Sequence, residues 1–259
     1  MVQDPPGDST VAPDGDDLHL EPVSVEGVGT VLVLAVRGRL AEVAEPAYFS
    51  VLLGLAEEPA AVVCDVSGVT GPLDPESVAL LASLGVEVEQ WPGVPIALVC
   101  PDGQLREALA ARPDTRHLMV EPERQPVLGR LLARPPASTV RMSLEPDPRS
   151  AGAAREVVAK ACDRWGMASV SASATLVVSE LVTNALPHAG SNVGLSVARS
   201  GRRLRVAVRD ASSQRPQPQP VETSRPRGRG LLLVAALADA WGVLPAGDGG
   251  KVVWAVLHD

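Results

Sequence analysis

Aromatic residues are scarce in this 259-residue chain, which has four tryptophans, one tyrosine and one phenylalanine. Since 46% of the residues are hydrophobic, the core must be built mainly from Val, Leu and Ala. Exposed aromatic platforms for stacking nucleic-acid bases are therefore not expected. The apolar content excludes global disorder. The length predicts two compact domains, because domains average roughly 100 to 200 residues, and one large domain is the alternative.

Cysteines and long apolar runs are also few. Cys64, Cys100 and Cys162 stand in apolar stretches without a Cys-x-x-Cys pair, which predicts buried reduced thiols rather than disulfides or a zinc site. The longest apolar run, Leu231 to Ala238, is far shorter than the roughly 20 residues that cross a bilayer. The acidic N-terminus has neither the basic nor the apolar segment of a signal peptide. We therefore expect a soluble, cytoplasmic protein that does not contact membranes.

Charge is distributed unevenly along the chain. Residues 1–140 hold 8 basic and 21 acidic side chains, a net charge of −13, whereas residues 141–259 hold 15 and 10, a net charge of +5. This asymmetry indicates either that the second half meets an anionic partner or that the two halves attract each other. Direct binding of nucleic acid is not expected, because a net charge of +5 with only two lysines is a weak electrostatic footprint.

The first half has the pattern of an α/β domain. Residues 1–19, rich in Pro, Gly and Asp, are predicted to be a disordered leader. The domain itself is expected over residues 20–133, where apolar strand-like runs alternate with helix-like stretches. Such alternation predicts a sheet covered by helices on at least one face. The expected strands are 31–36, 60–66, 94–100 and 117–120, and the expected helices are 46–58, 74–90, 103–111 and 125–133.

The second half has a different order of predicted elements. The paired prolines within residues 134–138 predict a linker, and a second domain is expected over residues 139–259. A strand over 139–144 precedes two helices, the first with Asp147 as its N-cap and the second over 169–186. A hairpin, a long loop over 211–227, a helix over 231–240 and two closing strands follow. This order predicts an α+β domain of two layers.

Three polar residues share one face of the second of these helices. Glu180, Asn184 and His188 are spaced four apart on an otherwise apolar helix. Glutamate and asparagine oxygens suit a hard cation such as Mg²⁺ that bridges substrate phosphates, although a solvated polar stripe gives the same pattern. Asp210 ends a strand just before the long loop, and Gly228-Arg229-Gly230 opens the next helix, where backbone N–H groups can approach phosphates.

Taken in order, these motifs give a more specific signal. The segments SELVTNALPHA, VRDAS, GRGLLLVAALADAWGV and GKVVWAVL follow one another between residues 179 and 257. Over residues 139–259 the chain resembles the Bergerat-fold ATP-binding domains of histidine kinases and related ATPases. It is most similar to their anti-sigma-factor serine kinase branch.

The resemblance implies a role for each matching residue. Glu180 is expected to act as the general base on an attacking hydroxyl, Asn184 to hold Mg²⁺ between the phosphates of ATP, and Asp210 to bind the adenine amino group. His188 fits the motif with either a packing or a catalytic role. The remaining positions implied to bind nucleotide are Arg227, Gly228, Arg229, Gly230 and Leu231, with Arg225 as a further arginine of the loop.

Some positions depart from the pattern of that family. Ser212 stands where a glycine usually follows the aspartate, and the threonine or serine that supports the aspartate is missing near Lys251. Pro187 is expected to end the helix just after Asn184. These departures leave open whether the second domain binds nucleotide strongly, weakly or not at all.

The first domain resembles, more faintly, the STAS domains of anti-sigma-factor antagonists. The similarity rests on VLVLAVRGRL, VVCDVSGVTG and PIALVCP, within residues 20–133. In those proteins a serine directly after an aspartate accepts phosphate, but here Asp74 is followed by Pro75, Glu76 and Ser77. Glu76 could imitate a phosphorylated state, or the segment is a plain helix cap with proline in the first turn.

Three hypotheses for function follow. The first is an anti-sigma-type serine/threonine kinase that uses Mg²⁺ and ATP, phosphorylates a STAS antagonist and controls a sigma factor. The second is a non-catalytic binding module in which the STAS-like half acts as a pseudo-substrate. The third is an ATP hydrolase without a protein acceptor. The sequence leaves open whether the chain forms a homodimer.

Overall fold

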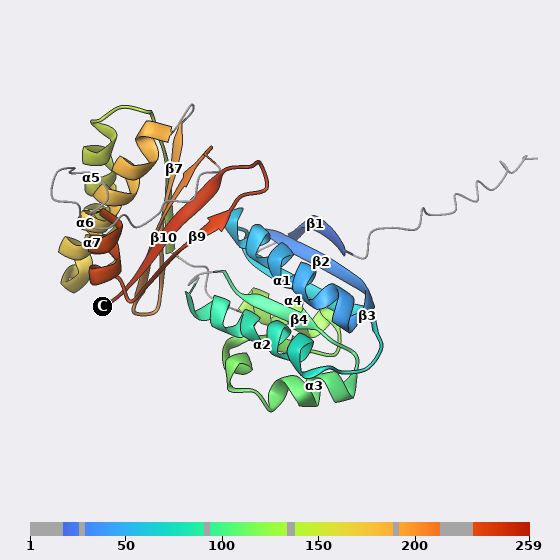
Figure 1. The fold of residues 1–259 in the computed structure, drawn as a ribbon. Helices are drawn as coiled ribbons and strands as arrows, with labels where there is room; N and C mark the ends of the chain where they lie inside the picture. The colour runs from blue at the N-terminus through green and yellow to red at the C-terminus, as the bar shows by residue number, and fades with distance from the viewer. Residues whose placement is uncertain (1–17, 26–28, 91–93, 134–137, 189–191, 213–229) are drawn as a thin grey trace, which may run out of the picture.

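The computed structural model describes residues 18–25, 29–90, 94–133, 138–188, 192–212 and 230–259. They form two units, one in each half of the chain, and each unit is built on its own five-stranded sheet (Figure 1). The fold class expected from the sequence, an α/β unit followed by an α+β unit of two layers, is confirmed. None of the described helices is both long enough and apolar enough to cross a membrane.

The sheet of the first unit is mostly parallel, with strand order β1-β2-β3-β4-β5. Strand β1 runs antiparallel to β2, whereas β2 to β5 are parallel to one another. The strands are β1 (Leu18–Val25), β2 (Gly29–Arg39), β3 (Ala61–Thr70), β4 (Ile96–Val99) and β5 (Met119–Glu121). The helices between them are α1 (Leu40–Ala56), α2 (Pro75–Gln90), α3 (Gly103–Ala110), the 3-10 helix η1 (Pro113–His117) and α4 (Arg124–Ala133).

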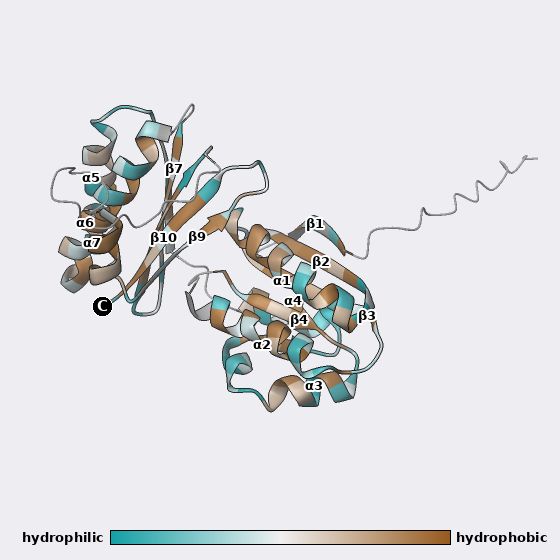
Figure 2. Cartoon of the chain, in the orientation of Figure 1, coloured by the Kyte–Doolittle hydropathy of each residue, from teal (hydrophilic) through white to brown (hydrophobic). Residues whose placement is uncertain are grey.

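Helices cover both faces of this first sheet. Residues of α1, α2 and α3 share one apolar core with one side of the strands, and α4 packs through Val127 and Leu131 on the opposite side. Much of β2, β3 and β4 is hydrophobic (Figure 2). Their apolar residues belong to cores on both faces, as a parallel sheet buried on both sides requires. Cys64 and Cys100 lie in this core and Cys162 in that of the second unit, all buried and free of disulfides, so the prediction of buried thiols is confirmed. Burial raises the pKa of the Cys64 thiol to about 12.

The second unit is an antiparallel sheet with helices on one face. Its strand order is β6-β7-β8-β10-β9. The strands are β6 (Ser138–Leu144), β7 (Val193–Ser200), β8 (Arg203–Asp210), β9 (Ala240–Pro245) and β10 (Lys251–His258). The helices are α5 (Ser150–Trp165), α6 (Ala168–Ala185), the 3-10 helix η2 (Leu186–His188) and α7 (Gly230–Leu237). They share a core with alternate residues of the strands, for example Val206 and Val208 of β8.

The other face of the second sheet contacts the first unit. The contact is visible where α1 lies beside β9 and β10 (Figure 1). Trp254 and Val252 of β10 belong to the same core as the buried residues of α1. Around them, Glu57 and Glu58, which follow α1, form ion pairs with arginines of β6 and β8. These pairs agree with the opposite net charges of the two halves.

Several boundaries differ from those expected, among them the start of α1, which lies at Leu40 instead of residue 46, so that Pro46 falls inside the helix. Strand β1 begins at Leu18, inside the predicted leader 1–19, of which residues 1–17 lie outside the described part. Helix α5 begins at Ser150, because Asp147 forms a turn with Arg149 instead of capping the helix. Helix α7 ends at Leu237, because Ala240 already pairs with Val256 in the sheet. In the predicted linker 134–138, Ser138 belongs to β6 and the other positions are outside the described residues.

Candidate nucleotide site

Helix α6 presents the first two predicted site residues. Its buried positions, which include Val177, Val178 and Leu181, face the core, and Glu180 and Asn184 are half-buried one turn apart along its side. The helix ends at Ala185, as Pro187 predicts, and the chain continues as a 3-10 turn that includes His188.

Glu180 lies against the beginning of helix α7. A Cβ atom added to Gly230 would overlap with Oε2 of Glu180, so only glycine allows the carboxylate to come this close to the helix backbone. The structure thus brings together Glu180 and Gly230, which are 50 positions apart. Leu231, the next residue, has 8% of its surface exposed and its side chain packs in the core of the second unit, so its predicted contact with nucleotide stays a prediction. Arg225, Arg227, Gly228 and Arg229 lie outside the described residues.

Asp210, the predicted adenine-binding residue, is buried at the end of β8. Its Oδ1 accepts a hydrogen bond from the backbone N–H of Ser212 over 2.8 Å. The same oxygen accepts one from Nζ of Lys251 over 2.7 Å. Lys251 also donates to the carbonyl oxygen of Ser212 over 3.1 Å. The carboxylate is therefore held inside a buried ion pair, and its other oxygen, Oδ2, has no hydrogen-bond partner in the described part of the chain.

The sequence motifs do not predict the contact between Lys251 and Asp210. They show only that the supporting threonine or serine is missing near this position. Lys251 starts β10, whose residues 253, 255 and 257 face the same helical core, and its side chain is only 4% exposed. The signal in the sequence is a lone lysine in phase with apolar residues of a strand, where a buried charge requires a partner.

The phosphate-acceptor region of the first unit has the geometry of a helix cap. Asp74 precedes α2, Pro75 is its first residue, and Oδ1 of Asp74 accepts a hydrogen bond from the N–H of Ser77 over 2.8 Å. Ser77 is 7% exposed, so its hydroxyl is poorly placed to accept phosphate from another protein. The expected N-terminal cap with proline in the first turn is confirmed.

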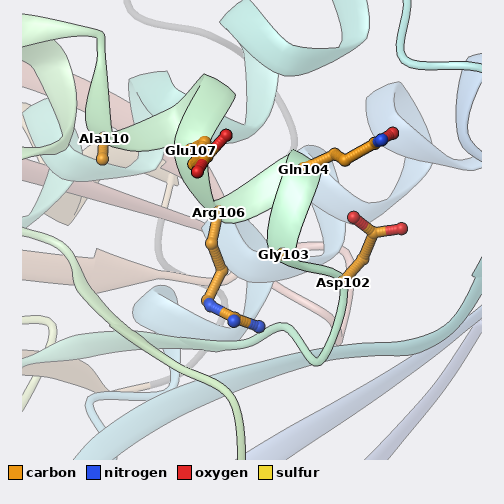
Figure 3. A pocket seen from close by; sticks show the side chains of 6 residues that line it. All are labelled: Asp102, Gly103, Gln104, Arg106, Glu107 and Ala110. Atoms are coloured by element: carbon orange, nitrogen blue, oxygen red, sulfur yellow. The ribbon is translucent and has the colours of Figure 1, made fainter.

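Two further hollows lie elsewhere on the described residues. One is a shallow depression beside helix α3, lined by Asp102, Gln104 and Arg106 among others (Figure 3). Its polar groups serve the local fold, because Asp102 caps α3 and Arg106 donates to the carbonyl oxygens of residues 100 and 101. The other, of about 370 Å³, lies between the units beside Glu57 and Arg209. Among the residues that the structure describes, no cluster of His, Cys, Asp and Glu is arranged to hold a metal ion.

Comparison with known proteins agrees with the motifs of the second unit. Residues 144–257 match the family described as histidine kinase-like ATPase domain. This part of the chain is a histidine kinase-like ATPase domain. The match runs from Leu144, the last residue of β6, into β10 and includes Glu180, Asn184 and Asp210. The family of the first unit is not identified by these comparisons.

Comparisons with curated proteins and with solved structures do not extend this assignment of a histidine kinase-like ATPase domain. No curated protein is similar enough to the chain to count as a relative. Among solved structures, it resembles the crystal structure of the RsbU and RsbW domains of Rv1364c from Mycobacterium tuberculosis, with 20% identity and a TM-score of 0.37. That alignment covers 48% of this chain and 33% of the other, so the likeness spans about a third of that structure.

Proposed function

We propose that the protein is an anti-sigma-type serine/threonine kinase that uses Mg²⁺ and ATP. It transfers the γ-phosphate to a serine of a STAS-domain antagonist and thereby controls the availability of a sigma factor, a role exercised in the cytoplasm. The match of residues 144–257 to the histidine kinase-like ATPase domains carries this proposal, because that family's name implies ATP as the ligand. The placement of Glu180 against Gly230 supports it.

The residues of the second unit fit this ligand in two respects. Because Gly230 has no Cβ, the first residue of α7 lies directly against the carboxylate of Glu180. The proposed general base therefore stands beside a helix N-terminus, the kind of position where phosphates bind well. The amide oxygen of Asn184 is a ligand type that Mg²⁺ accepts. In the proposal Asn184 holds Mg²⁺, which neutralises phosphate charge when bound, and Glu180 accepts the proton of the attacking hydroxyl.

A non-catalytic binding module is the second candidate, and one observation favours it. The carboxylate expected to bind the adenine amino group is already paired with Lys251. The pseudo-substrate form of this hypothesis finds no support in the contact between the units. The end of α1 packs against the sheet face formed by Val252 and Trp254, whereas the core that α6 and α7 share with the sheet lies on the opposite face.

A phosphotransfer assay tests the proposal. The full-length protein is incubated with Mg²⁺, γ-labelled ATP and a set of STAS-domain proteins, beside the variant Glu180→Gln. We expect label on a serine or threonine of a STAS protein, and a loss of at least about 100-fold in Glu180→Gln, the usual contribution of general-base catalysis. Glu156→Gln is the matched control, because Glu156 is a 72%-exposed residue of α5 that forms an ion pair with Lys160 one turn further along the helix.

The other outcomes separate the alternatives. Release of inorganic phosphate with no labelled protein would identify an ATP hydrolase. Binding of a STAS protein without any turnover of ATP would identify a non-catalytic module. Equal labelling by Glu180→Gln and the unmodified protein would remove Glu180 from its assigned role.

A further inference from the structure

The most unusual group of the second unit is the buried pair of Asp210 and Lys251. The two residues are direct partners in the antiparallel register of β8 and β10. Their side chains are 1% and 4% exposed. Gly250 makes this close approach possible, because a Cβ there would overlap with the backbone oxygen of Asp210. The pair is thus fixed by the backbone of two neighbouring strands, not by a flexible surface contact.

The pair also determines what Asp210 can offer to a ligand. Oδ1 already accepts two hydrogen bonds, from Lys251 and from the N–H of Ser212. Oδ2 is buried and has no partner among the described residues, and a buried acceptor of this kind is incompletely satisfied unless a donor reaches it. One acceptor therefore remains for the N–H of a ligand, but its negative charge is neutralised by the adjacent ammonium group.

We propose that Lys251 is a specificity-determining residue of the nucleotide site and competes with the amino group of adenine for Asp210. This inference rests on the proposed function, since it assumes that the second unit binds a purine nucleotide. Hydrogen bonds to a charged carboxylate are stronger than those between neutral groups. The ion pair therefore lowers the affinity for ATP and removes most of the preference for a base that carries an amino group.

The first test uses the unmodified, full-length protein and needs no substitution. Isothermal titration calorimetry in the presence of Mg²⁺ compares ATP with inosine triphosphate, which carries an oxygen in place of the amino group. We expect the two dissociation constants to agree within about threefold, because Asp210 favours the amino group while Lys251 favours the oxygen. A preference of tenfold or more for ATP would overturn the inference.

The second test removes the lysine. Lys251→Thr leaves the carboxylate free for the adenine amino group, so ATP should bind about tenfold more tightly and the preference over inosine triphosphate should rise by about the same factor. Lys160→Thr is the matched control, because Lys160 is the chain's other lysine and its side chain is 74% exposed. It should bind both nucleotides as the unmodified protein does.

Folding of Lys251→Thr is checked in the same experiment. The substitution leaves a buried carboxylate without its cation, so the nucleotide-free variant should melt at a lower temperature and gain more from added ATP than the unmodified protein. If Lys251→Thr binds ATP no better than an unmodified protein that does bind it, the inference is wrong and the proposed function stands. If neither protein binds any nucleotide although both are folded, the inference and the proposed function both fail.

Discussion

Glu58 is predicted to hold the two units together, and its removal is the sharpest test of the structure. Glu58 follows α1 and its side chain is 13% exposed. Its Oε1 lies 3.1 Å from Nη2 of Arg205, a residue of β8 that is 2% exposed, and its Oε2 lies 3.2 Å from Nε of Arg141. Burial lowers the pKa of Arg205, and the nearby carboxylate of Glu58 opposes this shift. The acidic residue thus compensates a charge that has been taken out of water.

The expected effect of Glu58→Ala follows from this arrangement. Removing one partner of a buried ion pair generally costs about 3 to 5 kcal/mol, because the remaining charge is left buried. Separation of the units would let Arg205 regain water, so the loss is bounded by the free energy with which the units dock. Alanine retains a Cβ at a position whose φ is +51°, so the comparison isolates the carboxylate. We expect a loss of about 3 kcal/mol.

Urea denaturation followed by tryptophan fluorescence measures this loss. Trp254 is 4% exposed in the core shared by the units and reports on their contact. A loss of about 3 kcal/mol corresponds to a shift of the midpoint by at least about 1 M urea, since the dependence on urea is about 1 to 3 kcal/mol per M.

Two further variants make this prediction specific. Glu58→Ala combined with Arg205→Met removes both charges and should return to within about 1 kcal/mol of the unmodified protein. Glu42→Ala removes a carboxylate of an exposed pair with Arg39, 3.9 Å apart, and should change stability by no more than about 0.5 kcal/mol. If Glu58→Ala unfolds at the same urea concentration as Glu42→Ala, the buried pair does not stabilise the contact between the units.

Two other predictions concern the first unit. Gly85→Ala should lower the free energy of unfolding, measured by thermal denaturation, by about 1 to 3 kcal/mol, because the added Cβ would overlap with a backbone carbonyl of η1. Gly129→Ala is the control, and it should be neutral or slightly stabilising because the space around Gly129 is open. Burial acts to raise the pKa of Asp65, but hydrogen bonds from Ser67 and Arg124 outweigh it, so this pKa lies below its ordinary 3.8. The charged carboxylate of Asp65 therefore stabilises the fold above about pH 4, and this contribution is lost as the pH falls further. Between about pH 5 and about pH 2.5 the melting temperature of Asp65→Asn should fall less than that of the unmodified protein. An equal fall would refute this prediction.

Local patterns in the sequence determined the elements and most of their order. Apolar runs separated by helical stretches predict every strand of both sheets except β1, and Pro187 predicts where α6 ends. The helical spacing of Glu180 and Asn184 places both on one side of α6. Strand β1 was missed because its flanking residues, rich in Pro, Gly and Asp, resemble a disordered leader.

Contacts between distant segments were decided by the tertiary structure alone. The alternation of residues along β8 shows that Arg205 and Asp210 lie on opposite faces, but it does not show what covers either face. Because β10 inserts between β8 and β9, Lys251 meets a carboxylate 41 positions away. Because α1 docks on the other face, Arg205 is buried with Glu58 instead of facing water. Both results depend on strand order and docking, which the periodicity of a single segment does not encode.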